Sequence, residues 1–371
     1  MSDKDLSLLT EGADMMRICN SCRYCEGYCA VWPAMEFRRV FAPGDLRYLA
    51  NLCHDCSDCY YACQYAPPHP FSVNPPKTFA RIRNHSYEKY AWPKPLASAF
   101  RANGLVVSLV MALTLIAFML GVVLIKGSES LTTAFSDGNF YRIVSHETLI
   151  VIFGIVGFFS VLALGVGLIR FWKDSGEKVS DLFNPFALAV AAKEILRLKY
   201  LDGDGWGCRY PGEEGSQSRR WFHHFTFYGF MLCFAATTVG VIYHYVFGWH
   251  APHEFMSLPV VLGTLGGIGL LVGPVGLLSL KFRRNRDITD ASQIGMDASF
   301  LVLLFLTSAT GLLLLFLRQT SAMGILTVVH LGIVMALFLT LPYGKFVHSI
   351  FRAAAILKYA LERKRKKIIG A

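Results

Sequence analysis

The stretch CNSCRYCEGYC (residues 19–29) carries four cysteines in the pattern C-x2-C-x2-C-x3-C, and CHDCSDCYYAC (residues 53–63) repeats that pattern. Three closely spaced cysteines followed by a fourth are typical of chains that bind cubane [4Fe–4S] clusters, each of which needs four thiolates. The two runs therefore predict two clusters within one small N-terminal domain.

In two-cluster ferredoxins, the fourth cysteine of each run binds the other cluster. By this crossed arrangement, one cluster would be held by Cys19, Cys22, Cys25 and Cys63. The second would be held by Cys53, Cys56, Cys59 and Cys29. The crossing would join the two halves of a segment that has little apolar core of its own.

Zinc is the alternative, but zinc sites use two separated pairs of cysteines, and a third cysteine at the same tight spacing would be surplus. No secretory signal peptide opens the chain, so we expect reduced thiols rather than disulfides. The runs depart from the bacterial ferredoxin signature because Ala30 and Gln64, not proline, follow their last cysteines. The pairing is therefore less constrained than the set of eight ligands. Cys208 and Cys233 are expected to be ordinary thiols.

The rest of the chain is apolar. Of 371 residues, 54% are hydrophobic, and the mean hydropathy is +0.42. Six runs approach the ~20 residues that cross a bilayer as a helix: 101–125, 147–170, 222–247, 257–281, 297–318 and 323–350. The sequence predicts a mainly α fold: a ferredoxin-like domain with two [4Fe–4S] clusters (residues 1–95), then a transmembrane domain of six helices (residues 96–371) with a polar insertion (residues 171–221).

The net charge of +10 is distributed over alternate loops. One side of the membrane has most of the basic residues, including KFRRNR (281–286), ERKRKK (362–367), Arg170, Lys173, Arg219 and Arg220. The other side has Lys126, Arg142 and Arg318. Because cytoplasmic loops hold the Lys and Arg, both termini and the cysteine domain are expected in the cytoplasm of a bacterial inner membrane. The charge is thus a topology signal, and we expect no nucleic-acid partner.

Two segments of the membrane domain have further signals. Residues 184–200 have an apolar and a basic face, as in helices that lie flat on a membrane or pack on a soluble domain. The Gly-rich loop at 201–221 is expected to dock the cysteine domain against the membrane domain. The glycines of GTLGGIGLLVG (263–273) are expected to allow close helix packing.

Histidines within the apolar runs predict b-type haem, because ionisable residues at membrane depth are usually functional. On one continuous last helix, His330 and His348 would share a face ~27 Å apart. The predicted pairs are His348 with His223 or His224 near the cytoplasm, and His330 with His244, or His146 in its place, near the outer face. One haem is predicted and a second is possible; the alternative for any single histidine is an interfacial residue. The remaining histidines are expected at the surface: His54, His69, His85, His250 and His253. The absence of C-x-x-C-H excludes covalent c-type haem.

The whole chain resembles the tricarballylate- or citrate-utilisation protein B family, through the doubled cysteine runs, GCRYPGEEGSQSRR (207–220), RRWFHHFTFYGF (219–230) and YHYVFG (243–248). The resemblance implies a two-cluster ferredoxin fused to a membrane cytochrome b. It implies that a separate FAD-dependent dehydrogenase acting on tricarballylate is reoxidised and that quinone receives the electrons. Residues 330–348 are also similar to the haem-bearing helix of nitrate reductase gamma subunits, in which paired histidines at this spacing bind two haems. That family's second histidine on the partner helix is Phe234 here.

The soluble part has no dinucleotide fingerprint, so we expect the flavin on the partner. No Ser–His–Asp or paired-carboxylate arrangement is visible either. The predicted function is electron transfer within a quinone-reducing oxidoreductase system, with the flavoprotein, quinone and the lipid bilayer as partners. The alternative is a membrane-bound iron–sulfur sensor or assembly component without haem. A metal transporter with a zinc-binding head would need carboxylates in the spans, where they are nearly absent.

Overall fold

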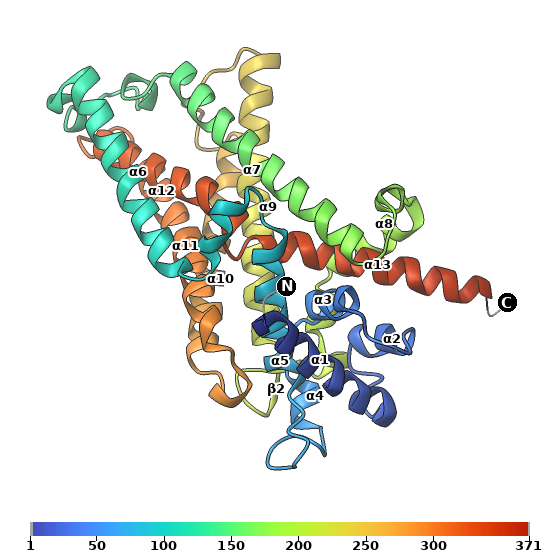
Figure 1. The fold of residues 1–371 in the computed structure, drawn as a ribbon. Coiled ribbons are helices and arrows are strands. Elements are labelled where there is room, and N and C mark those ends of the chain that lie inside the picture. The colour runs from blue at the N-terminus through green and yellow to red at the C-terminus, as the bar shows by residue number, and fades with distance from the viewer. Residues whose placement is uncertain (1–2, 370–371) are drawn as a thin grey trace.

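The computed structural model of the chain describes residues 3–369 and is mainly helical (Figure 1). Residues 1–2 of the first predicted domain and residues 370–371 of the second lie outside the described residues, and so do the two termini. The N-terminal part, called here the cysteine domain, contains α1 (Asp3–Cys22), α2 (Val31–Glu36), α3 (Pro43–Leu52), α4 (Asp58–Tyr61) and α5 (Pro75–Tyr90).

Six helices within the described residues are long and apolar enough to cross a membrane. They are α6 (Asn103–Lys126), α7 (His146–Asp174), α9 (Ser218–Val246), α10 (Leu258–Phe282), α11 (Ile294–Leu317) and α12 (Met323–Thr340). Outside them lie α8 (Pro185–Leu196), α13 (Val347–Ile369) and a small antiparallel pair, β1 (Cys208–Arg209) with β2 (Gly215–Ser216). The predicted mainly helical fold with six spans is confirmed, and the chain is a multi-pass membrane protein.

Glycines bring α9 and α10 into close contact. A Cβ atom added at Gly266 of α10 would lie 2.8 Å from the backbone nitrogen of Cys233, and one added at Gly269 would lie 2.8 Å from the carbonyl oxygen of Phe225. Gly229 of α9 faces the same seam, since its Cβ would lie 2.9 Å from the carbonyl oxygen of Gly266. Small residues let helix backbones approach in this way. The seam holds α9, and therefore His223, at a fixed position.

Gly266→Val is expected to destabilise the protein by about 1–3 kcal/mol, because the added side chain overpacks this seam. Thermal unfolding in detergent measures the change. Gly263→Val in the same helix is the matched control, since a Cβ there meets the Ala236 side chain at an ordinary 3.6 Å. Equal melting temperatures for the two variants would contradict the close packing.

The last span ends earlier than predicted. The single helix expected over residues 323–350 is wrong, because α12 ends at Thr340 and α13 begins at Val347. Pro342 lacks the N–H that a continuing helix needs, and Gly344 is extended with φ −132° and ψ −166°. Asn103, at the start of α6, donates a hydrogen bond to the carbonyl oxygen of Tyr343 at 2.6 Å and fixes the break. His330 and His348 are therefore not on one helix.

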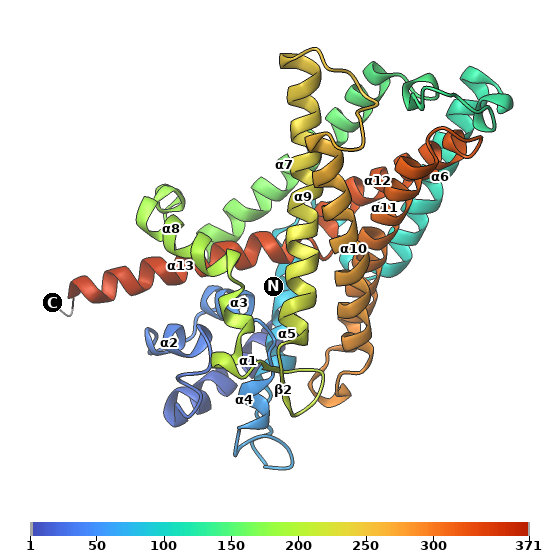
Figure 2. The ribbon, with the colours of Figure 1, turned by 180° about the vertical axis from the view of Figure 1, so that it is seen from behind.

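After the break, α13 leaves the bundle and runs between α7 and the cysteine domain (Figure 1; Figure 2 shows the opposite side). Glu362 of α13 accepts hydrogen bonds from Arg38 at 2.5 Å and from the Tyr48 hydroxyl at 2.9 Å, both of the cysteine domain. Buried residues of the cysteine domain, α7, α8 and α13 form one continuous apolar core. This core crosses the boundary predicted at residues 95 and 96.

Helix α8 forms within the predicted polar insertion and packs along α13. Its buried residues are Ala187, Ala191 and Glu194, and Glu194 is paired with Arg363 of α13 at 3.0 Å. The expected positions of this segment, flat on a membrane or packed on the soluble domain, both stay open: one face of α8 packs on α13, and the opposite face is exposed.

Candidate redox site

The eight cysteines of the two runs line two neighbouring pockets. The first, called here the distal pocket, is lined by Cys19, Cys22, Cys25, Cys63 and also Cys59. The second, the proximal pocket, is lined by Cys29, Cys53, Cys56 and Cys59. Each pocket thus receives the four cysteines that the crossed arrangement assigns to one cluster. Their binding of iron stays a prediction.

Local backbone geometry produces this convergence. Helix α1 ends at Cys22, and the positive φ of Arg23 (55°) turns the chain toward Cys25. In the second run, Asp55 (φ 59°) and Ser57 (φ 71°) are left-handed, which wraps the segment around Cys56 before the short helix α4. Aspartate tolerates this conformation better than most residues. The tight spacing therefore makes loops whose thiols point inward.

Burial raises the pKa of several of these thiols. Burial and the neighbouring Cys63 and Cys22 thiols raise the pKa of Cys25 to about 12. Burial also raises the pKa of Cys59, with further contributions from Cys53 and Cys29. Iron binds thiolates, so loading would release protons and would supply positive charge that compensates four sulfurs in each pocket.

The donor set fits a cluster better than zinc. Four cysteines from two separate runs surround each pocket, as a four-iron cube requires. In a zinc site the third tightly spaced cysteine of each run would be surplus.

Three arginines hold the backbone of the proximal loop. Arg83 donates to the carbonyl oxygens of Ala50 at 3.1 Å and Cys53 at 2.7 Å. Arg352 of α13 also donates to the Cys53 carbonyl, at 2.8 Å. Arg219, at the start of α9, donates to the carbonyl oxygens of His54 at 2.9 Å and Asp55 at 2.7 Å. The proximal loop is thus bonded directly to two helices of the membrane domain.

Asp55 adds an ion pair to this junction. Its carboxylate accepts two hydrogen bonds from Arg284, at 2.6 and 2.8 Å, and the Arg284 side chain is 2% exposed. Burial alone would raise the pKa of Asp55, but Arg284, Arg83 and Arg219 together hold it below its ordinary range. The carboxylate is therefore charged and anchors the loop that carries Cys53 and Cys56.

Asp55→Asn is expected to lower the stability of the protein by about 3–5 kcal/mol, because it leaves the Arg284 guanidinium buried without its counter-charge. Thermal unfolding in detergent is the measurement. Asp137→Asn is the control, since Asp137 pairs with Arg142 at 2.7 Å on an exposed surface. An Asp55 variant no less stable than the control would show that the junction does not depend on this pair.

His223 of α9 and His348 of α13 face each other across a gap. Their ring centroids lie 6.3 Å apart, and the ring planes are inclined by 75°. Metal–imidazole bonds are about 2.0 Å long, so two imidazoles on opposite sides of one metal ion have centroids roughly 6 Å apart. The spacing therefore suits two axial ligands of a haem.

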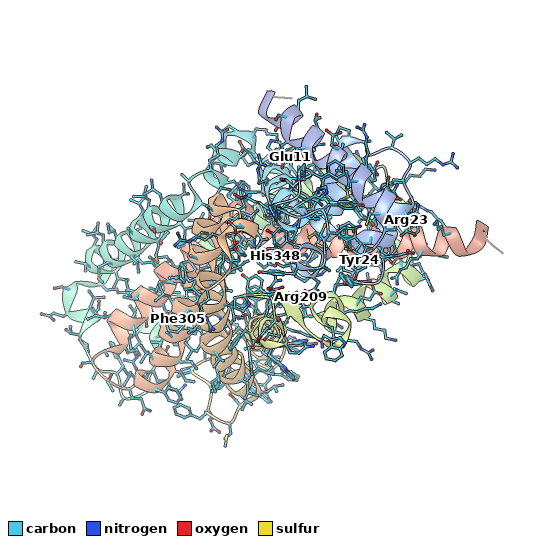
Figure 3. All side chains as sticks on the ribbon, turned by 90° about the horizontal axis from the view of Figure 1, so that it is seen from below. Glu11, Arg23, Tyr24, Arg209, Phe305 and His348 are labelled. Atoms are coloured by element: carbon cyan, nitrogen blue, oxygen red, sulfur yellow. The ribbon has the colours of Figure 1, made fainter. Side chains whose placement is uncertain are left out.

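A hydrogen bond supports this role for His348, and a buried ring nitrogen without a partner among the described residues supports it for His223. The Nδ1 atom of His348 donates to the carbonyl oxygen of Lys345 at 2.6 Å, which leaves its Nε2 as a ligand. A backbone carbonyl commonly orients metal-binding histidines in this way. The Nδ1 of His223 is buried, and no described residue accepts or donates a hydrogen bond there. Figure 3, a view from below, shows His348 near the middle of the molecule.

Both histidines line a cavity of about 270 Å³ with an apolar wall and a cationic side. Its apolar wall includes Phe227, Phe230, Phe300 and Leu304. Its charged lining is Arg83, Arg219, Lys281, Lys345, Arg352, Asp55 and Asp297. Five cations face two carboxylates, so three positive charges remain, which suits the two propionates of a haem. The described residues fit a b-type haem here.

His224 does not take part in this pair. It stacks on Tyr228 with centroids 5.6 Å apart and planes inclined by only 9°. One residue further along α9 turns the side chain by about 100°. Of the two histidines left open by the sequence, the structure places His223 opposite His348.

The predicted outer pair, His330 with His244 or His146, stays a prediction, because the contacts of these histidines are with other side chains. His244 stacks on His146, with centroids 4.0 Å apart, and its Nδ1 lies 3.0 Å from the Nδ1 of His250. His330 instead lies against Gly311 of α11, and its Nδ1 lies 3.0 Å from the Thr310 hydroxyl. The break after Thr340 removed the reason to align His330 with His348, and the geometry supports one haem.

Several residues of the site had no signal in the sequence. His54 is not a surface residue: it is 7% exposed, lines the proximal pocket and is bonded through Nδ1 to the Leu52 carbonyl at 2.8 Å. Cys208 is fully buried beside Cys56. The Arg209 backbone N–H donates to Asp58 at 2.8 Å, so the Gly-rich loop reaches the cysteine domain. The docking role expected of the Gly-rich loop is the only feature of the sequence that indicates such contacts.

Comparisons with known proteins agree with this division of the chain. Residues 98–368 match the family model described as citrate utilization protein B, and residues 12–89 match its Fer4-like domain. The chain is 50% identical over 358 residues to citrate utilization protein B of Escherichia coli, which covers 96% of this chain and 93% of that relative. The chain belongs to the citrate utilization protein B family. No solved structure matches it.

For this family member, the match to the Fer4-like domain contains the eight cysteines of the two pockets. This match confirms the prediction that the N-terminal domain is a ferredoxin-like iron–sulfur domain. The match to the longer family model includes all six spans together with His223 and His348.

Proposed function

We propose that the chain is an electron-transfer protein of a bacterial inner membrane, with the cysteine domain and both termini in the cytoplasm. It takes electrons from a reduced FAD-dependent dehydrogenase and delivers them to quinone. The family resemblance implies tricarballylate as the partner's substrate, and the name of the E. coli relative refers to citrate. Both acids carry three carboxylates, so a tricarboxylate is the proposed substrate class.

One observation carries the proposal: the distal pocket, the proximal pocket and the histidine cavity follow one another from the surface to the membrane domain. Exposed Arg23 and Tyr24 border the distal pocket. Cys59 lines both pockets. Asp55 lines both the proximal pocket and the histidine cavity. Neighbouring sites share residues throughout, as a relay requires.

Two [4Fe–4S] clusters and a b-type haem would supply one-electron redox chemistry at these three sites. The chain's own residues set the conditions. The proximal cysteines are the more buried, with Cys53 and Cys56 8% and 7% exposed, so water is excluded there. Arg83 and Arg352 place two positive charges at the Cys53 carbonyl. Positive charge near a redox site favours its reduced state.

The test is the metal and haem content of protein purified without oxygen. We expect about eight non-haem irons and one protoporphyrin per chain, from two cubes and one bis-histidine site. Dithionite should produce the split visible bands of a reduced b-type cytochrome. A preparation with the iron and sulfide but no porphyrin would instead favour the membrane-bound sensor or assembly component. A preparation that contains neither iron and sulfide nor porphyrin would refute the proposal.

A further inference from the structure

An apolar strip on α8 faces away from the rest of the protein. Ala187, Ala191 and Glu194 are buried toward α13. The residues on the opposite side of the helix are all apolar and all exposed: Pro185, Leu188, Ala189, Ala192 and Leu196. In water such a face would be unfavourable, since each exposed large apolar side chain forgoes roughly 1.5–3 kcal/mol of burial. The strip is therefore expected to be covered.

The position of α8 is at the edge of the membrane domain. It follows α7, a spanning helix that ends at Asp174, and lies beside α13 in both views of the fold (Figures 1 and 2). Two aromatic side chains are also exposed here, Phe183 at 74% just before α8 and Phe186 at 52% in its first turn. The exposed apolar surface of α8 thus lies next to the end of the spanning helix α7.

Basic residues border the strip. Lys178, Lys193 and Arg197 are exposed, and no ion pair to a described carboxylate involves them. The nearby acids are already engaged: Glu194 pairs with Arg363 at 3.0 Å and Glu177 with Arg365 at 2.8 Å. The Lys364 ammonium lies 5.3 Å from the centre of the Phe186 ring. The border of the strip therefore has a net positive charge.

We infer that α8 lies in the membrane surface on the side of the cysteine domain and binds anionic phospholipid through this face. The apolar strip enters the acyl boundary, and Lys193 and Arg197 contact phosphate groups. Amphipathic helices with basic borders bind membranes in this manner, and each basic residue near an anionic leaflet strengthens the contact. A lipid explains why cations lie directly beside the apolar strip at the end of a spanning helix, whereas a protein partner would not require that arrangement.

Lipid contact at α8 would steady α13. His348 lies in the first turn of α13, and further along the same helix Glu362 is bonded to the cysteine domain. A lipid-bound α8 therefore supports the helix that joins the histidine cavity to the cysteine pockets. The inference itself depends only on the membrane location of the chain and not on the proposed electron transfer.

Photo-crosslinking in nanodiscs of phosphatidylcholine and phosphatidylglycerol tests this. Benzoylphenylalanine replaces Leu188 in the full-length protein, and irradiated samples are analysed by mass spectrometry. The control places it at Trp206, which is 86% exposed but lies in the Gly-rich loop. We expect lipid adducts at position 188 and few at 206. Phosphatidylglycerol should be enriched among the adducts about fivefold per contacting cation.

The double substitution Lys193→Gln and Arg197→Gln should bring this enrichment close to one while lipid adducts persist, because the apolar strip is unchanged. Three results would overturn the inference. The first is equal adduct yields at positions 188 and 206. The second is a cross-linked second chain in place of lipid, which would make the strip a protein interface. The third is an unchanged enrichment in the double variant.

Discussion

Protein carrying His348→Ala is expected to contain almost no haem. The ring centroid of His348 lies 6.3 Å from that of His223, and its Nδ1 is bonded to the Lys345 carbonyl, so in the proposed site its Nε2 would bind the haem iron. Loss of residues that merely support a ligand already weakens metal sites 10–100-fold, and loss of the ligand should do more. The measurement is porphyrin content per chain, together with the spectrum of the dithionite-reduced protein.

His224→Ala is the matched control, because His224 is adjacent in sequence but stacks on Tyr228 away from the cavity. It should keep its full haem content, and His223→Ala should lose it. About eight non-haem irons should remain in all three variants, which separates haem loss from unfolding. Full porphyrin content in the His348 variant, or loss in the His224 variant, would rule out the assigned pair.

Substituting Cys53 with serine is expected to remove the proximal cluster and about half of the non-haem iron, from about eight atoms to about four. Cys53 is buried in the proximal pocket, and its serine hydroxyl would be a poor ligand for iron. Iron analysis gives the count, and electron paramagnetic resonance of the reduced protein identifies which cluster remains. Cys233→Ser, outside both pockets, should keep all eight irons.

Cys29→Ser tests the crossed arrangement. Cys29 belongs to the first run in the sequence but lines the proximal pocket. Its variant should therefore lose the same paramagnetic signal as Cys53→Ser. Loss of the other signal, shared with Cys19→Ser, would mean that each run binds its own cluster.

Features with a strong local origin could be predicted from the sequence. The six spans follow from hydropathy, because a bilayer requires about 20 apolar residues in an unbroken helix. The grouping of the eight cysteines followed from the spacing of two short runs. The glycines of α10 were expected to allow close packing, and Gly266 and Gly269 do contact α9 closely.

The course of the chain after Thr340 was predicted wrongly, although Pro342 and Gly344 carry a signal for the end of a helix. Helical arithmetic across that break placed His330 and His348 on one face. His348 still meets His223, because α13 starts at the end of the bundle where the third span begins. Only the alignment of His330 with His348 depended on that arithmetic; the outer pair stays a prediction.

The residues that join the cysteine domain to the membrane domain could not be predicted. Arg219 lies at the end of the Gly-rich loop that is expected to dock the cysteine domain, but nothing in the sequence indicates its partner, a loop 164 residues away. Arg352 bonds the Cys53 carbonyl across 299 residues. Such contacts depend on the docking of two domains, and no periodicity or spacing in either domain encodes them.

The turn at residues 341–346 also sets how the cysteine domain is attached. After this turn, α13 shares its core with the cysteine domain, so the domain is packed on a helix and is not held by a flexible linker. A carrier domain on a flexible linker shuttles between two docking positions, and its rate depends on that diffusive search. In the proposed electron transfer, this packing would fix the separation of the cysteine pockets and the histidine cavity, so solvent viscosity should have little influence on the rate.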